Sequence, residues 1–204
     1  GPDPGPGPGP KPEPEIGNPN LQYWQDDSLT WSAEGTDWRN DGGEVDVAWA
    51  GNHGVFRGTG DRTGGRIDLV GAQRFRGLQF VEDGYLLAGS GKLQTVAGGS
   101  ELRVLAGETA TIAAEITGRG GIEKTQGGTL ILTGVNSYSG ATQIAAGTLA
   151  LQGAGDISAS EALRFTGAGL FDLSGVAEPA AQIGTLSGVV GSEIRLGATG
   201  LEVV

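Results

Sequence analysis

The chain has 204 residues, including 40 glycines, one histidine, no cysteine and no methionine. Its net charge of −11 and pI near 4.4 repel phosphate backbones and anionic headgroups, so nucleic acid and a peripheral membrane surface are poor partners. The lack of cysteine excludes a disulfide framework and thiolate metal sites. No apolar run is long enough to cross a bilayer, and no signal peptide is visible.

Residues 1–20 form a distinct segment that reads GPDPGPGPGPKPEPEIGNPN. Eight of the nine prolines of the chain lie in it. Because proline fixes φ and removes a backbone donor, this composition predicts an extended linker or tether. A Pro-rich recognition ligand is the functional alternative.

Residues 21–60 hold a cluster of large aromatic residues, namely Tyr23, Trp24, Trp31, Trp38 and Trp49. The open end of a β-structure presents unpaired strand edges, and aromatic side chains could cover them. We therefore predict an N-terminal cap and the first coils of the fold in this region. A platform on which carbohydrate rings stack is the functional alternative.

Residues 61–204 consist of short apolar alternations that end at glycine. They are RIDLVG (66–71), LRVLAG (102–107), TLILTG (129–134), TLALQG (148–153), ALRFTG (162–167), LFDLSG (170–175) and EIRLG (193–197). Apolar residues at a spacing of two predict strands with one buried face. Two-residue Asn-Gly or Asp-Gly loops typical of hairpins are nearly absent, with Asp83-Gly84 as the exception that follows a strand-like run.

Repeats on two scales predict how these strands stack. Leu130 and Leu149 stand 19 residues apart in the two TLxLxG copies, and GSELRV at Gly99 returns as GSEIRL at Gly191, 92 residues later. Such repeats indicate a solenoid of about eight coils with roughly 20–25 residues each. In that fold Leu130, Leu132, Leu149 and Leu151 point into a continuous core, and Gly134 and Gly153 turn corners. The final LEVV is no polar cap, so we expect the natural protein to continue beyond Val204.

Segment 118–151 closely resembles the repeat of passenger domains of Gram-negative autotransporters. The matching residues are Gly118, Gly120, Gly121, Ile122, Lys124, Gly128, Thr129, Leu130, Leu132, Gly134, Asn136, Tyr138, Gly140, Thr142, Ile144, Gly147 and Leu149. Gln126 departs from the pattern, because the family usually has glycine there. The weaker resemblance of the preceding region to a passenger start extends the likeness to residues 28–204.

The resemblance implies an all-β, right-handed parallel β-helix that is exported through the outer membrane by a C-terminal β-barrel absent from this chain. It also implies a surface adhesin active in adhesion, autoaggregation or biofilm formation. The implied partner is a host surface or matrix molecule, or a second passenger, and the membrane is contacted only through the barrel. A passive stalk and a polysaccharide-cleaving β-helix enzyme are the alternatives.

The sequence offers few candidates for chemistry, and we predict no catalytic, cofactor-binding or metal-binding residue and no cofactor. His53 is the sole histidine and has no nucleophile motif to serve. The segments GRGGIEKT (118–125) and GTGDRTGG (58–65) miss the spacing of nucleotide-binding loops. Stacked acids remain open as a glycosidase pair or a calcium site, for example Asp68, Glu101, Glu115 or Asp172.

Overall fold

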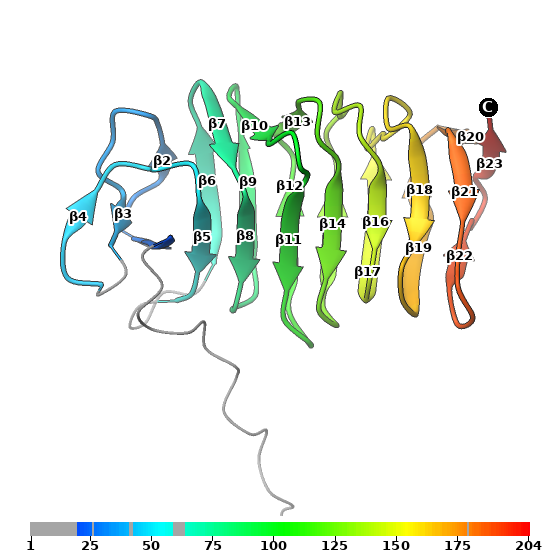
Figure 1. Cartoon of the computed structure of the whole chain (residues 1–204), viewed down its shortest axis with the longest axis horizontal. Helices are drawn as coiled ribbons and strands as arrows, with labels where there is room; N and C mark the ends of the chain where they lie inside the picture. Colours follow the sequence, from blue (N-terminus) through cyan, green and yellow to red (C-terminus); the bar gives the residue numbers. More distant parts are fainter. Residues whose placement is uncertain (1–19, 26, 41–42, 59–63, 179) are drawn as a thin grey trace, which may run out of the picture.

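A computed structural model describes residues 20–25, 27–40, 43–58, 64–178 and 180–204. These residues contain β-strands, turns and no helix, and hence no helix that could span a membrane. The strands stack side by side in a rod-shaped coil whose axis is horizontal in Figure 1, with residues 20–58 at the left end and the C-terminus at the right. The predicted tether lies almost entirely outside the described residues.

Within the described residues, the first sheet contains eight parallel strands and two antiparallel strands at its N-terminal edge. The parallel strands are β1 (Leu21–Trp24), β5 (His53–Phe56), β8 (Gly77–Phe80), β11 (Ser100–Val104), β14 (Ile122–Thr125), β16 (Thr142–Ile144), β18 (Ala162–Phe165) and β21 (Thr185–Ser187). The antiparallel strands are β3 (Trp38–Arg39) and β4 (Asp46–Val47).

The second sheet is parallel throughout. It comprises β2 (Thr30–Trp31), β6 (Gly65–Leu69), β9 (Tyr85–Gly89), β12 (Thr109–Ile112), β15 (Thr129–Leu132), β17 (Gly147–Gly153), β19 (Gly169–Val176) and β22 (Glu193–Arg195). The chain visits a strand of the first sheet and then one of the second in each turn. All seven predicted alternations form strands, which confirms the period-two reading.

The third side of the coil is interrupted. Three turns contribute the parallel strands β7 (Ala72–Phe75), β10 (Lys92–Thr95) and β13 (Glu115–Thr117), and the last turns contribute β20 (Ala180–Ile183) and β23 (Gly200–Val203). Between them, residues 133–141 and 154–161 form no strand and share one isolated bridge, Val135 to Asp156. Scattered backbone hydrogen bonds still join these segments to neighbouring turns, for example from Asn136 N–H to the carbonyl of Asp156, and side chains supply further polar contacts.

The predicted stacking is confirmed by register. Leu130 pairs with Leu149 and Leu132 pairs with Leu151, and all four side chains are buried. The chain forms a β-solenoid of about 7 turns, close to the eight expected. The handedness of the coil stays a prediction.

The 92-residue repeat does not correspond to a structural period. Its first copy lies in β11 of the first sheet and its second copy in β22 of the second sheet. The two segments are alike because both are short alternating strands after a glycine corner, with φ +90° at Gly99 and +88° at Gly191. Similar local requirements therefore produced similar sequences on different faces.

The core changes character along the axis. At the N-terminal end it contains aromatic rings from Trp24, Trp31, Trp38, Phe56 and Phe80, and further along it becomes mainly a stack of leucine, isoleucine, valine and alanine side chains, with Tyr138, Phe165 and Phe171 among them. Each turn alone has only a narrow apolar strip. Stacking makes that strip continuous, which is why stability depends on contacts between neighbouring turns.

Candidate functional site

The aromatic cluster closes the first turns of the coil. Trp24, Trp31 and Trp38 are each at most 1% exposed, and their rings make edge contacts with centroids 5.2 Å apart for Trp24–Trp38 and 4.9 Å for Trp31–Trp38. Trp49 packs against them and donates its indole N–H to the carbonyl of Arg74 at 2.6 Å. The aromatic side chains are buried in the first turns, and the division into a cap and coils stays a prediction. The alternative of a carbohydrate-stacking platform is wrong for the three buried tryptophans, since their faces are covered.

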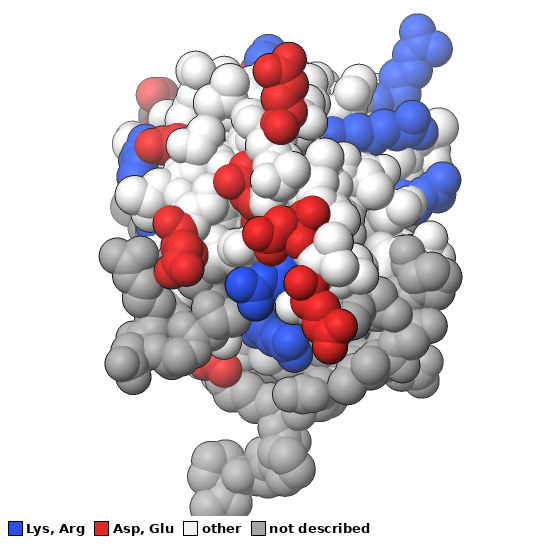
Figure 2. All heavy atoms as spheres, turned by 90° about the vertical axis from the view of Figure 1, so that its left-hand side faces the viewer, with Lys and Arg blue, Asp and Glu red and all other residues white. Residues whose placement is uncertain are grey.

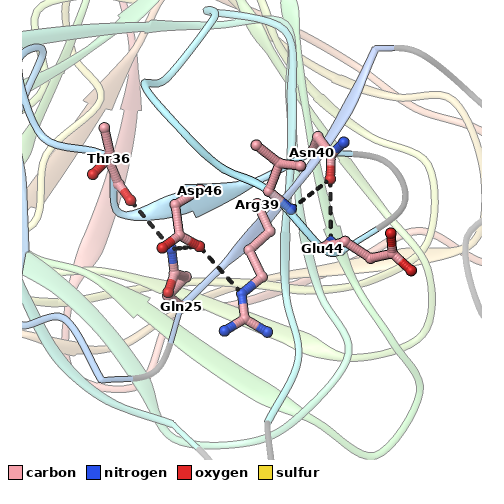
Figure 3. A network of polar contacts seen from close by, with 7 residues as sticks. Gln25, Thr36, Arg39, Asn40, Glu44 and Asp46 are labelled. Carbon is pink, nitrogen blue, oxygen red and sulfur yellow. Dashed lines mark hydrogen bonds and ion pairs between the residues drawn. The ribbon is translucent and has the colours of Figure 1, made fainter.

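The cap is also tied together by a polar network at its surface, drawn in Figure 3. Gln25 donates one side-chain hydrogen bond to Asp46 at 2.8 Å and another to the carbonyl of Thr36 at 3.1 Å. Arg39 Nε lies 3.6 Å from the same Asp46 carboxylate, and Asn40 Oδ1 accepts the N–H groups of Glu44 and Val45. These bonds hold β3 and β4 against β1, although each exposed contact contributes little.

The cap gives the N-terminal end a charged surface. Figure 2 looks onto this end and shows acidic side chains distributed over it. Exposed acids of the cap include Asp27, Glu34, Glu44 and Asp46. A coil end that continued its parallel ladders would attract other strand edges, and a charged antiparallel hairpin opposes such pairing.

A buried cation interrupts the aliphatic ladder in the middle of the coil. Lys124 pairs with Leu102 on one side and Ile144 on the other, and it is 0% exposed. Its ammonium donates hydrogen bonds to the carbonyls of Thr125 and Gln126 at 2.8 Å each and to that of Ala146 at 3.2 Å. Burial lowers the pKa of Lys124 to about 8. One ammonium thus satisfies three carbonyls at the corner of two successive turns.

Asn136 replaces the missing strand in the interrupted part of the third side. Its Oδ1 accepts the N–H of Ile116 at 2.9 Å, and its Nδ2 donates to the carbonyls of Gly134 and Asp156 at 2.9 Å each. These partners belong to three successive turns. A buried amide can do this because it offers both an acceptor and two donors, as a backbone peptide group does.

A chain of buried hydroxyls closes the same region. The Tyr138 hydroxyl lies 2.6 Å from Thr142 Oγ1, which donates to Ser160 Oγ at 3.0 Å, and Ser160 Oγ contacts the carbonyl of Gly140 at 2.8 Å. Burial raises the pKa of the Tyr138 hydroxyl, so it stays a neutral hydrogen-bonding group. The motif Asn-x-Tyr-x-Gly-x-Thr is therefore a set of internal contacts.

His53 lies on β5 and has no catalytic geometry among the described residues. Its half-buried ring packs over Gly77, where a Cβ would come within 2.6 Å of it, and its Nδ1 is buried without a hydrogen-bond partner. Burial lowers the pKa of His53, with Glu101 opposing that shift and nearby arginines adding to it. A neutral imidazole that lacks both a nucleophile and an orienting carboxylate does not form a triad.

The four stacked acids lie on three different sides of the coil and are each paired with a base. Ion pairs join Asp68 to Arg66 at 2.7 Å, Glu115 to Lys92 at 2.7 Å, Asp172 to Arg195 at 2.8 Å and Glu101 to Arg103 at 3.8 Å. The structure therefore does not assemble them into a glycosidase pair. Within the described residues no group of three or more His, Cys, Asp or Glu side chains could hold a metal.

The pKa shifts of two of these acids are also opposite to those of a general acid. Hydrogen bonds from Lys92 and Ser137 lower the pKa of Glu115. For Asp172, burial favours the neutral form, but hydrogen bonds from Ser174 and Arg195 outweigh it and lower the pKa. A glycosidase general acid needs a raised pKa to keep its proton.

The segment GRGGIEKT folds as a corner followed by strand β14, so it lacks the helix of a phosphate-binding loop. Residues 122–151 match the model of the passenger-associated-transport-repeat. These are the residues that contain Lys124, Asn136, Tyr138 and Thr142. This part of the chain is therefore similar to the passenger domains of autotransporters.

A curated relative supports this assignment. Over 83 residues the passenger segment is 47% identical to the adhesin BmaC autotransporter of Brucella suis biovar 1 (strain 1330), an alignment that covers 38% of this chain and 2% of the relative. The chain thus spans a very small part of that relative. No solved structure matches the chain. Both matches indicate a protein that is exposed at the cell surface and anchored in the outer membrane.

The sequence motifs did not reveal one buried charged residue of the repeat. The pattern places Lys124 in the repeat but gives no sign that its charge points inward. The alignment of GGSEL (98–102) with GGIEK (120–124) contains the signal, because it sets Lys124 opposite the core residue Leu102. Register between turns, not the residue type, identifies the buried position.

Proposed function

We propose that this passenger segment acts in surface adhesion, through side-chain contacts made along a rigid rod and without an active site. The observation that supports the proposal is the continuous solenoid, in which backbone groups pair between successive turns. Such a rod presents several contact points to one extended partner, and several weak contacts combine into strong attachment. The relative that shares 47% identity is named an adhesin.

Attachment of coated beads tests the proposal. Beads coated with the chain should bind to host cells or extracellular matrix, or aggregate with one another, whereas albumin-coated beads should not. Beads coated with a Gly120→Ala chain, in which we expect the coil to be broken, provide the misfolded control. Gly98→Ala serves as its folded counterpart, because a Cβ at Gly98 meets no atom within 4 Å.

A passive stalk is the second candidate, and the paired charges on the outer faces favour it. Ion pairs such as Arg66–Asp68 and Arg195–Asp172 neutralise surface side chains that could otherwise contact a partner. Folded beads that neither attach nor aggregate would support the stalk and contradict the adhesin.

A non-enzymatic role belongs to the same proposal. The lowered pKa values of Glu115 and Asp172 and the separation of the four acids over three sides support it. Release of reducing sugar from acidic polysaccharides by the purified chain would contradict it.

A further inference from the structure

The sole histidine of the chain lies where the N-terminal cap, residues 20–58, joins the next turn of the coil. His53 is on β5, which pairs with β1 of the cap on one side and with β8 on the other, and the register sets His53 opposite Gly77. Its ring occupies the space beside that glycine, where a Cβ would lie 2.6 Å from His53 Cδ2. The imidazole therefore packs across the boundary between the cap and the rest of the coil.

The outer face of β5 is apolar next to this ring. Val55, two positions after His53, is fully buried in a second apolar cluster with Tyr23, Val81 and Leu105. Residues two apart on a strand point to the same face, so the ring borders this cluster on one side. A charged imidazole is disfavoured in such surroundings because it loses hydration.

One nitrogen of the ring has no place for a second proton. Nδ1 is buried and has no hydrogen-bond partner in the part of the chain that the structure describes. In the neutral ring this atom can remain an acceptor without a proton. In the charged ring both nitrogens are donors, so a buried N–H group would lack an acceptor. Protonation of His53 therefore adds an unsatisfied donor to the boundary between β5 and β8.

The charged groups around the ring also favour its neutral form. Arg76 immediately precedes β8, and Arg103 lies on β11. The carboxylate that opposes them, Glu101, already accepts a hydrogen bond from Thr125 at 2.7 Å and lies 3.8 Å from Arg103. Strands β1 and β8, which flank β5, contain no charged residue. A protonated His53 would thus be the third cation around one carboxylate that is already engaged.

The direction of the pH effect follows from the pKa of His53. Burial lowers this pKa from its ordinary value of 6.5; Glu101 opposes the shift, and Arg76 and Arg103 add to it. Arg57, which follows β5, lies over the ring of Tyr23 at 4.4 Å. Once the cap separates from β8, the imidazole regains its ordinary pKa, so the open state binds more protons than the closed state. Acidification below pH 6.5 therefore favours the open state.

We infer that His53 is an acid-sensitive contact whose protonation loosens β5 from β8 and opens the N-terminal cap, while the passenger repeat stays folded. An opened cap leaves one edge of β8 unpaired, and an unpaired edge can pair with another strand. Because histidine is the only side chain with an ordinary pKa between pH 5 and 8, one residue accounts for the response in this interval. The inference does not depend on adhesion.

The four tryptophans report on the cap alone, because all of them lie within residues 20–58. Their quenching by acrylamide should be measured at pH 7 and pH 5.5, together with hydrogen exchange corrected for the intrinsic rate. In the wild type, the opening equilibrium of β5 should rise several-fold at pH 5.5, and that of β14 and β15 should stay unchanged. His53→Gln, which cannot take up a proton, should open equally at both pH values. Equal pH responses of the two proteins, or a wild-type cap that opens less at pH 5.5, would overturn the inference.

Variants of the neighbouring charges keep the test independent of any packing defect in His53→Gln. Arg76→Gln should reduce the ratio of opening at pH 5.5 to opening at pH 7, because it removes a cation that disfavours the charged ring. Glu101→Gln should increase the same ratio, because it removes the opposing carboxylate. Arg66→Gln, on β6 of the second sheet, is the matched control and should leave the ratio unchanged. A ratio that moves in the same direction in Arg76→Gln and Glu101→Gln, or in neither, would contradict the role of His53.

Discussion

The N-terminal cap of the described coil and the repeat at its centre are stabilised by different chemistry. The N-terminal cap, comprising residues 20–58, fills the coil with tryptophan rings and ends it with the antiparallel strands β3 and β4. The passenger repeat, residues 122–151, contains no tryptophan and uses glycine corners, a buried lysine and a buried asparagine. A cap must stop further stacking, whereas a repeat must accept a neighbour on both sides. Bulky aromatic side chains therefore suit the cap, and close contact between the backbones of neighbouring turns suits the repeat.

The largest expected effect comes from the glycine corner that immediately precedes the repeat. Gly120→Ala should destabilise the chain by more than about 4 kcal/mol, because the new Cβ would lie 1.8 Å from the carbonyl oxygen of Val96 and both partners are backbone. Gly98→Ala should change the free energy of unfolding by less than about 0.5 kcal/mol. Urea unfolding followed by far-UV circular dichroism measures both. Similar stabilities for the two variants would show that the turns can separate at little cost.

A slightly smaller effect is expected in the cap. Trp38→Ala should cost about 3–5 kcal/mol, because it removes a fully buried ring that contacts Trp24, Trp31, Trp49 and Phe56. Trp38→Phe should cost less, since the indole N–H of Trp38 has no hydrogen-bond partner to lose. Hydrogen exchange should show β1 and β3 opening in Trp38→Ala while β14 and β15 stay protected. Equal exposure of the whole coil would mean that cap and repeat unfold as one unit.

The contrast between cap and repeat also explains how much the sequence could reveal. Period-two apolar runs ending in glycine predicted the strands and the stacking of Leu130 on Leu149, since burial of one strand face leaves a regular trace. The two-residue strands β3 and β4 have no room for an alternation, so their antiparallel pairing had no sequence signal. The aromatic composition of the cap still predicted its burial.

The candidate sites were harder to predict because they depend on register between turns. A lysine at a strand position normally faces solvent, and only its alignment with Leu102 places Lys124 inside. Single-strand patterns do not contain that information.

Removing the buried ammonium tests whether the repeat depends on it as the cap depends on its rings. Lys124→Met keeps the length and the apolar stem but leaves the carbonyls of Thr125, Gln126 and Ala146 without their donor. We expect a loss of about 2–3 kcal/mol, from unsatisfied carbonyls offset in part by the removal of a buried charge. A variant as stable as the wild type would show that water or backbone adjustment replaces the ammonium.

The difference in stability between the wild type and Lys124→Met should also depend on pH. The pKa of Lys124 is lowered in the folded state to about 8 from an ordinary value of 10.5, so between these values the unfolded chain binds more protons. The contribution of Lys124 to the free energy of unfolding therefore rises as the pH increases between these two pKa values. The difference in unfolding free energy between wild type and Lys124→Met, measured at pH 7 and pH 10, should shift in favour of the wild type. A difference that falls or stays constant would contradict a buried, readily deprotonated ammonium.

The smallest expected effect concerns the position at which the repeat departs from its family pattern. Gln126 adopts φ +65°, and among the described residues no other non-glycine residue has a positive φ. A left-handed conformation costs a side-chain-bearing residue about 1–2 kcal/mol, and glycine avoids that cost but loses more entropy on folding. Gln126→Gly should therefore stabilise the chain by about 0.5–1 kcal/mol, since the carbonyl that Lys124 binds is retained. Gln143→Gly, in strand β16, should have the opposite sign because glycine weakens a strand interior. If Gln126→Gly is destabilising as well, the glutamine side chain contributes contacts that offset its backbone strain, and the repeat tolerates this departure for that reason.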